Sequence, residues 1–133
     1  MRLWNSARRE RDSRLQAGAR HARGKRVEAA HDATALLEAV FPSGDRVCIE
    51  GGNQKQADLL AAALAAVEKS KILYLRMVQT GVVLPEHLDV FERGIAKRLD
   101  YSFSGPQADG IAKLLAGGKI ELGGHYLLTG DVS

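Results

Sequence analysis

The sequence predicts an α/β fold, with one mostly parallel sheet and helices on both of its faces. Short apolar segments alternate along the chain with segments of helical period, and this alternation is typical of βαβ units. The segment 72–78 is apolar almost throughout, as expected of a strand whose two faces are both covered. The 133 residues suit a single domain that is large enough to bury a core.

Two helices and two strands are expected in the first half of the body. Asp32 is a good helix N-cap, and apolar residues follow it three and four positions apart. These apolar residues are Ala33, Leu36, Leu37, Val40 and Phe41. After the turn residues 42–45 we expect a strand at 46–50 and a second helix at 54–67. The strand at 72–78 comes next.

The second half continues the alternation. Pro85 suits the first turn of a helix. Alternating polar and apolar residues predict a half-buried strand at 99–103, and the helix after it ends at Gly117. A last strand is expected at 119–122. An α/β unit normally continues into another helix, so the sequence after residue 122 indicates either a fragment or the edge of the sheet.

Charge divides the chain into two predicted parts. Residues 1–28 hold nine Lys or Arg and three acids, hence +6, whereas residues 29–133 hold ten and thirteen, hence −3. The first part has few apolar residues and no clear period, so we expect a basic arm with one helical turn near 8–15, followed by a partial α/β domain. A basic arm can bind nucleic acid, but the acidic body argues against it. The alternatives are a solubilising arm and one that docks on a partner subunit.

Composition excludes several classes of protein. No apolar run approaches the roughly 18 residues of a membrane helix, and no apolar stretch follows the first arginines as in a secretory signal. We therefore expect a cytoplasmic protein. The single cysteine, Cys48, excludes an internal disulfide and a cysteine-cluster metal site, and no metal site is expected. Because Cys48 lies mid-strand, we expect a buried structural thiol.

The first candidate ligand loop follows the strand at 46–50. Ligands of open α/β sheets bind beyond the carboxyl ends of the strands. Gly51 and Gly52 let the backbone approach a ligand, and Asn53 completes the break after the strand. Gln54 and Lys55 begin the predicted helix, whose N-terminus suits phosphate or carboxylate. The helix dipole disfavours Lys55 there, which hints at function. A tight turn with a solvent-exposed lysine is the open alternative.

The second candidate loop comprises Ser104, Gly105, Pro106 and Gln107 after the strand at 99–103. The side chains of Ser104 and Gln107 can hydrogen-bond a ligand. The alternative is a helix start with Ser104 as its cap and Pro106 in its first turn.

Two titratable residues are candidates for catalysis. Glu50 ends a strand at the ligand edge, where it is either a nucleophile or a polar strand terminus. His87 is either a base or a surface residue of a short amphipathic helix. No Ser-His-Asp set can be assembled, so the catalytic residues stay unassigned.

Three segments resemble the alpha subunit of bacterial malonate decarboxylase, a family related to the class I coenzyme A transferases and the citrate lyase alpha subunit. They are MRLWNSARRE (1–10), GDRVCIEGGNQKQADLLAAAL (44–64) and MVQTGVVLPEHLDVFERGIAKRLDYSFSGPQ (77–107). The resemblance extends to about Leu122. The combination of GNQKQAD, LPEHLDVFERG and DYSFSGPQ makes it specific.

The resemblance implies the coenzyme A transferase-like α/β fold, of which this chain would hold an incomplete first half, and an acyl carrier protein transferase. That subunit exchanges acetyl for malonyl on the thiol of the carrier's prosthetic group, a phosphoribosyl-dephospho-coenzyme A, so this chain would bind no cofactor directly. The expected partners are the acyl carrier protein, the other decarboxylase subunits, and malonate or acetate. By motif position, residues 51–56 and 104–107 would contact the ligand.

The family's subunit is much longer, and the glutamate nucleophile of the class I mechanism belongs to a second half that this chain lacks. We therefore expect the isolated chain to be inactive, and an open sheet edge to favour self-association. The alternative is a non-catalytic scaffold or interaction fragment of the same fold.

Overall fold

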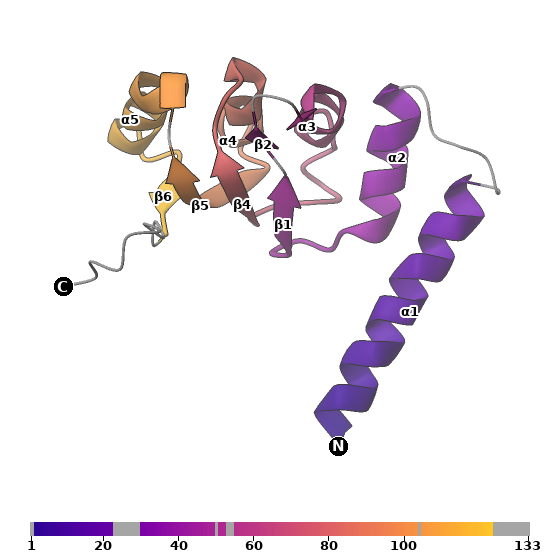
Figure 1. Ribbon diagram of the computed structural model, residues 1–133. Coiled ribbons are helices and arrows are strands. Elements are labelled where there is room, and N and C mark those ends of the chain that lie inside the picture. The colour runs from indigo at the N-terminus through magenta and orange to yellow at the C-terminus, as the bar shows by residue number, and fades with distance from the viewer. Residues whose placement is uncertain (1, 23–29, 50, 53–54, 104, 124–133) are drawn as a thin grey trace.

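The computed structural model describes residues 2–22, 30–49, 51–52, 55–103 and 105–123. Its centre is a four-stranded parallel sheet. In spatial order the strands are β1 (Arg46–Ile49), β4 (Leu75–Gly81), β5 (Ala96–Phe103) and β6 (Glu121–Leu122), as Figure 1 shows. The predicted parallel α/β sheet is confirmed, and each of its four expected strands is present.

The strand boundaries differ from the predicted ones most clearly at β4. Tyr74 has a φ of 59°, in the left-handed region, which a strand residue does not adopt. The strand therefore begins at Leu75 and not at Ile72, and it continues to Gly81. Ile72 is buried in the loop before the strand.

The prediction that helices cover both faces of the sheet is wrong for the described residues, because burial alternates along the strands. In β1, Val47 and Ile49 are buried while Arg46 and Cys48 are exposed. In β4, buried and more exposed residues alternate in the same way. The segment 72–78 is apolar almost throughout in sequence partly because three of its residues, Ile72, Leu73 and Tyr74, belong to the loop before the strand. Each of these two strands has one face in the core and one open face. Cys48 lies on the open face of β1 and is exposed, so the expectation of a buried thiol is wrong.

Helices cover the buried face. They are α2 (Ala30–Val40), α3 (Asp58–Ala65), α4 (Asp89–Glu92) and α5 (Ala108–Ala116), with 3₁₀ turns η1 (Pro85–Leu88) and η2 (Gly105–Gln107). Their apolar residues form one core with the buried sides of the strands, and its fully buried members include Leu64, Ile72, Leu75, Met77, Phe91, Ile95 and Leu99. Asp32 lies in the first turn of α2 and not at its N-cap, because the helix begins at Ala30.

The helix predicted at 54–67 begins only at Asp58. The residues before it form a short antiparallel pair, β2 (Gly51–Gly52) and β3 (Lys55–Gln56), in which Gly52 lies opposite Lys55. Two adjacent glycines disfavour a helix and suit a tight turn, which explains the late start. Lys55 therefore lies on a strand and not in the first turn of a helix.

Residues Arg2–Ala22 form the 21-residue helix α1, so the expectation of an arm with a single helical turn is wrong. The segment is rich in good helix formers, and the carboxylate of Glu10 pairs with Arg14 one turn away at 2.6 Å. The amino-terminal half of α1 extends away from the rest of the chain, as Figure 1 shows. The predicted boundary between arm and domain, at residues 28 and 29, lies outside the described residues and stays a prediction. Among the helices described, none is both long and apolar enough to span a membrane.

Candidate functional site

The carboxyl ends of β1, β4 and β5 lie at one edge of the sheet, because the three strands are parallel neighbours. Three connections leave the sheet at this edge: the β2–β3 pair after β1, residues 82–88 after β4, and η2 after β5. Ligands of open parallel sheets bind beyond such ends. Both predicted ligand loops are therefore at this edge, with the connection after β4 between them.

The structure places five of the eight predicted contact residues. Gly51 and Gly52 form β2, which lies against β4, and Lys55 is on β3. Gly105 and Gln107 form part of η2. The other three, Asn53, Gln54 and Ser104, lie outside the described residues.

Gln107 has a specific contact within the chain. Its Nε2 donates a hydrogen bond to the carbonyl oxygen of Val83 at 3.3 Å. This bond links η2 to the connection after β4. Gly105 begins η2 with a φ of 55°, a conformation that glycine adopts without strain. Gln107 thus holds η2 in position at the edge, and the positive φ at residue 105 explains why a glycine occupies that position.

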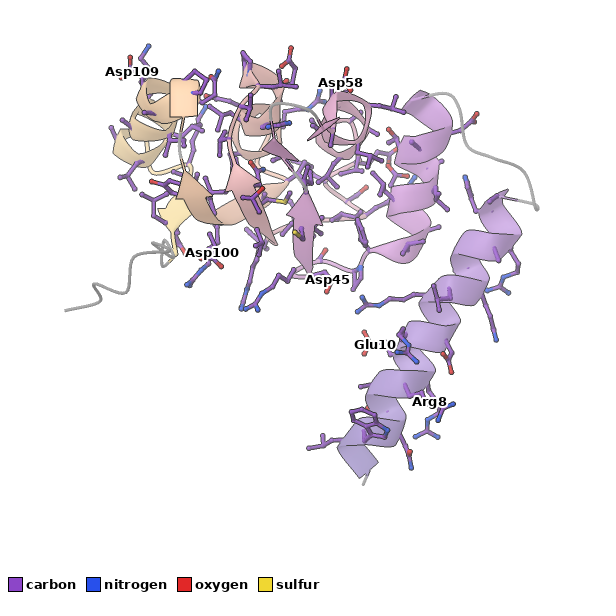
Figure 2. The ribbon with its side chains drawn as sticks, in the orientation of Figure 1. Arg8, Glu10, Asp45, Asp58, Asp100 and Asp109 are labelled. Carbon is purple, nitrogen blue, oxygen red and sulfur yellow. The ribbon has the colours of Figure 1, made fainter. Side chains whose placement is uncertain are left out.

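Acidic residues begin the helices that face this edge. Asp58 lies in the first turn of α3 and Asp109 in the first turn of α5, and both are exposed (Figure 2). Carboxylates there interact favourably with the helix dipole, and they repel an incoming phosphate. The expectation that the helix start after the first loop attracts phosphate is therefore not supported by the observed helix, which begins with an acid.

Gln79 is a polar residue of the core that sequence reasoning missed. It lies on the buried face of β4, only 2% exposed, and neither its Oε1 nor its Nε2 has a hydrogen-bond partner in the described part of the chain. An unpaired buried polar group destabilises a fold by roughly 1–3 kcal/mol. Such a group indicates an unseen partner such as water or a ligand. An amide on the core side of an otherwise apolar strand was the available signal.

His87 is also buried, at 2% exposure, so the interpretation of a surface histidine is wrong. Its Nδ1 accepts a hydrogen bond from the backbone N–H of Leu84 at 3.5 Å. Burial lowers the pKa of His87, against the smaller opposing effects of Glu86 and Asp58. The ring is then neutral at pH 7, and the remaining hydrogen is on Nε2. That Nε2 lacks a partner among the described residues.

These two side chains supply neutral hydrogen-bonding groups, which suit a carbonyl oxygen or an ordered water more than an anion. They are also the two buried polar residues of the described part, so it holds no buried carboxylate that could serve as a nucleophile. Glu50, the predicted candidate, lies outside it. The described residues contain no cluster of three or more His, Cys, Asp or Glu side chains that could hold a metal ion.

Comparisons with known proteins agree with one another. The family described as malonate decarboxylase, alpha subunit, transporter, matches residues 3–129. The acetyl-S-ACP:malonate ACP transferase of Malonomonas rubra is 43% identical over 122 residues, which are 92% of this chain and 22% of that protein.

Two solved structures are similar in fold as well as in sequence. The crystal structure of a malonate decarboxylase alpha subunit from Acinetobacter baumannii has a TM-score of 0.78 and is 36% identical. The Pseudomonas malonate decarboxylase hetero-tetramer in complex with malonate has a TM-score of 0.76 and is 45% identical. Each alignment covers 89% of this chain and 22% of the other. The chain thus spans about a fifth of the length of these relatives.

Proposed function

Because the chain belongs to the malonate decarboxylase alpha-subunit family, we propose that it forms the amino-terminal part of an acyl carrier protein transferase subunit. In the proposed reaction, acetyl-carrier thioester and malonate give malonyl-carrier thioester and acetate. The observation that carries this proposal is the family match across residues 3–129. The relative from Malonomonas rubra, named for this transfer, supports it.

The proposed ligand at the sheet edge is the thioester portion of the carrier's prosthetic group, a phosphoribosyl-dephospho-coenzyme A. The edge offers Gly51 and Gly52, which let the backbone approach a ligand, and the neutral buried groups of Gln79 and His87. Asp58 and Asp109 make the edge less suitable for the phosphates. The thioester carbonyl is therefore the part of the group that these residues fit.

The remaining predicted contacts stay part of the proposal. Asn53, Gln54, Lys55 and Ser104 would flank the ligand from the two outer loops, and Gln107 would act by holding η2 against Val83. The Pseudomonas hetero-tetramer supports the other decarboxylase subunits as partners, together with the acyl carrier protein.

A non-catalytic scaffold is the second candidate function. Acyl transfer requires a positioned nucleophile and donors for the developing oxyanion. The described residues hold neutral donors but no buried carboxylate. On this alternative the chain keeps the fold and contributes binding surface, while another part of the assembly supplies the nucleophile.

An isotope-exchange assay separates these functions. Labelled malonate and acetyl-carrier protein are incubated with the 133-residue chain and, in parallel, with the chain extended to the length of its relatives. We expect label in the carrier thioester with the extended protein and none with the chain alone. Exchange by neither protein would overturn the transferase proposal. Steady exchange by the chain alone that disappears in Glu50→Gln would instead identify Glu50 as the nucleophile.

A further inference from the structure

One face of helix α1 continues along its whole length but is covered over only half of it. In the carboxyl-terminal half, this face packs on α2 so closely that a Cβ added at Gly18 would lie 3.2 Å from Cγ2 of Val40. In the amino-terminal half, Leu3 is 87% exposed and Trp4 is 76% exposed. Trp4 and Gly18 lie 14 positions apart and, at about 100° per residue, on the same side of the helix.

The amino-terminal half of α1 is helical although little of the described chain packs against it (Figure 1), and a helix that is free in solution would be only marginally stable. Isolated helices shorter than about 12–15 residues are marginal in water, because most helix stability in proteins comes from packing. The projecting half of α1 has the same helical backbone as the packed half, yet the side chain of Trp4 in it is 76% exposed. Exposed tryptophan flanked by arginine is also typical of interface centres, and Arg8 and Arg11 line the same surface as Trp4.

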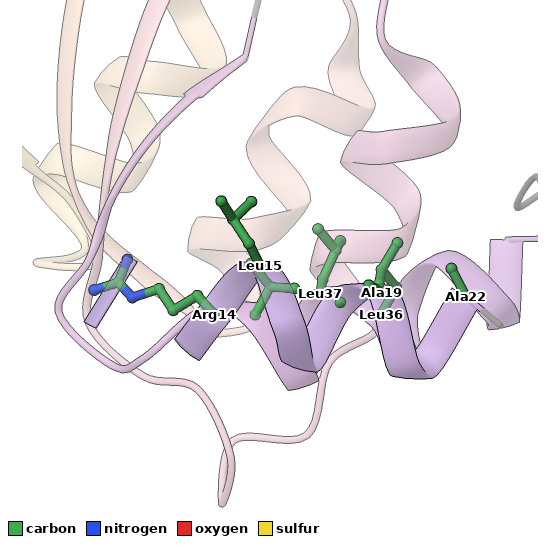
Figure 3. A pocket seen from close by; sticks show the side chains of 8 residues that line it. Arg14, Leu15, Ala19, Ala22, Leu36 and Leu37 are labelled. Atoms are coloured by element: carbon green, nitrogen blue, oxygen red, sulfur yellow. The ribbon is translucent and has the colours of Figure 1, made fainter. Parts of the chain in front are cut away.

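The same chain carries an apolar groove between α1 and α2, with a volume of about 390 Å³. Figure 3 shows its lining, which includes Leu15, Leu36 and Leu37, with Arg14 at one end. The guanidinium of Arg14 is bonded to the carboxylates of Asp45, at 2.8 Å, and Glu10, at 2.6 Å. Acidic groups therefore lie at one end of an apolar groove.

The projecting end and the groove are complementary in chemistry. The projecting end is an apolar tip flanked by arginines, whereas the groove is apolar with carboxylates at one end. Residues 1–28 carry +6 and residues 29–133 carry −3. Within one chain the Arg14–Asp45 pair already shows an arm arginine bound to a body carboxylate. We propose that two copies of this chain pair through antiparallel α1 helices, with Trp4 of each copy in the α1–α2 groove of the other.

Such an interface is isologous, since each copy inserts its Trp4 and each copy offers the same α1–α2 groove. Trp4 and Gly18 are separated by about 21 Å along the helix at 1.5 Å per residue. A two-fold axis halfway between them passes near Arg11. Asp12 lies 3.9 Å from the guanidinium of Arg11, so both signs of charge are present where the helices cross. The pairing does not depend on the proposed transferase activity.

Sedimentation velocity over a range of concentrations tests the proposal directly. We expect a monomer–dimer equilibrium, with a blue shift in the emission of the chain's one tryptophan as the dimer forms. Trp4→Ala should weaken the dimer about thirtyfold, the effect of losing an aromatic interface anchor. The matched control is Arg9→Ala, an exposed residue on the opposite side of α1. A monomer at every concentration, or equal weakening by both substitutions, would overturn the proposal.

A mixing experiment tests whether Trp4 of one copy binds in the groove of the other. Leu15→Lys places a charge in the groove at a residue that is 63% exposed, so the fold should persist, as circular dichroism would show. We expect Trp4→Ala and Leu15→Lys each to weaken the homodimer when measured separately. An equal mixture should form heterodimers more tightly than either variant forms homodimers, because one of the two contacts, the tryptophan of one variant in the intact groove of the other, is kept. Heterodimers no tighter than the homodimers would rule out this arrangement.

Discussion

The side-chain amide of Gln107 donates a hydrogen bond to the carbonyl oxygen of Val83 at 3.3 Å and so connects two neighbouring loops of the sheet edge. Gln107→Ala should lower the free energy of unfolding by about 1 kcal/mol, the usual contribution of such a bond. Urea unfolding measures this change. Gln16→Ala, which removes an exposed amide from α1, is the matched control and should have almost no effect.

Gln79→Leu should stabilise the chain while impairing the proposed function. The substitution replaces an amide with no partner among the described residues by an apolar group of similar size, so we expect about 1–2 kcal/mol of added stability. In the extended protein, the same substitution should slow acetyl–malonyl exchange. A less stable Gln79→Leu chain would show that the amide is already satisfied, for example by an ordered water.

The lowered pKa of His87 predicts a dependence of stability on pH. Burial disfavours the charged ring in the folded chain, so the unfolded chain binds the proton more readily. The contribution of the neutral ring to the free energy of unfolding is therefore fully present above about pH 6.5, the ordinary pKa of histidine. It is lost as the pH falls from there toward the lowered pKa of His87 in the folded chain. Unfolding curves from pH 7.5 to about 5 should show a loss that His87→Phe reduces. His21→Gln, at an exposed position, should leave the loss unchanged.

The open face of the sheet places like charges opposite one another. Arg76 pairs in register with Arg46 on one side and Arg98 on the other. Like charges directly opposite in a sheet are destabilising, so Arg76→Thr should raise the free energy of unfolding by several tenths of a kcal/mol. Added salt screens the repulsion and should shrink the difference. A gain that is independent of salt would point to strand propensity and not to charge.

Gly110 of α5 lies against Leu88, the residue that follows His87. A Cβ at this position would come within 2.5 Å of Cδ1 of Leu88, which is buried. Helix propensity alone would make Gly110→Ala stabilising by about 1 kcal/mol. We expect the opposite sign, a loss of about 1–3 kcal/mol, because the buried leucine has to move. Thermal and urea unfolding both measure it, and a gain in stability would show that Leu88 repacks freely.

The candidate site was only partly accessible to sequence reasoning. Four of the predicted contacts lie at the expected edge: Gly51, Gly52, Gly105 and Gln107. Local patterns were sufficient for these, because they show where each strand ends along the chain and which turn residues follow it. The helix dipole argument for Lys55 was wrong, since the double glycine delays the helix to Asp58. The burial of His87 was missed because η1 is too short to show a helical period.

By itself, the sequence determined the alternation of strands and helices, the parallel sheet that follows from it, and the family through its long motifs. These are consequences of apolar period, turn residues and residue order along the chain. Only the tertiary structure decided that one face of the sheet is open and that half of α1 projects (Figure 1). It also decided that Gln79 and His87 are buried without full hydrogen bonding among the described residues. Each of these depends on which distant segments cover a given surface, and the free energy of burial belongs to that contact and not to the local segment.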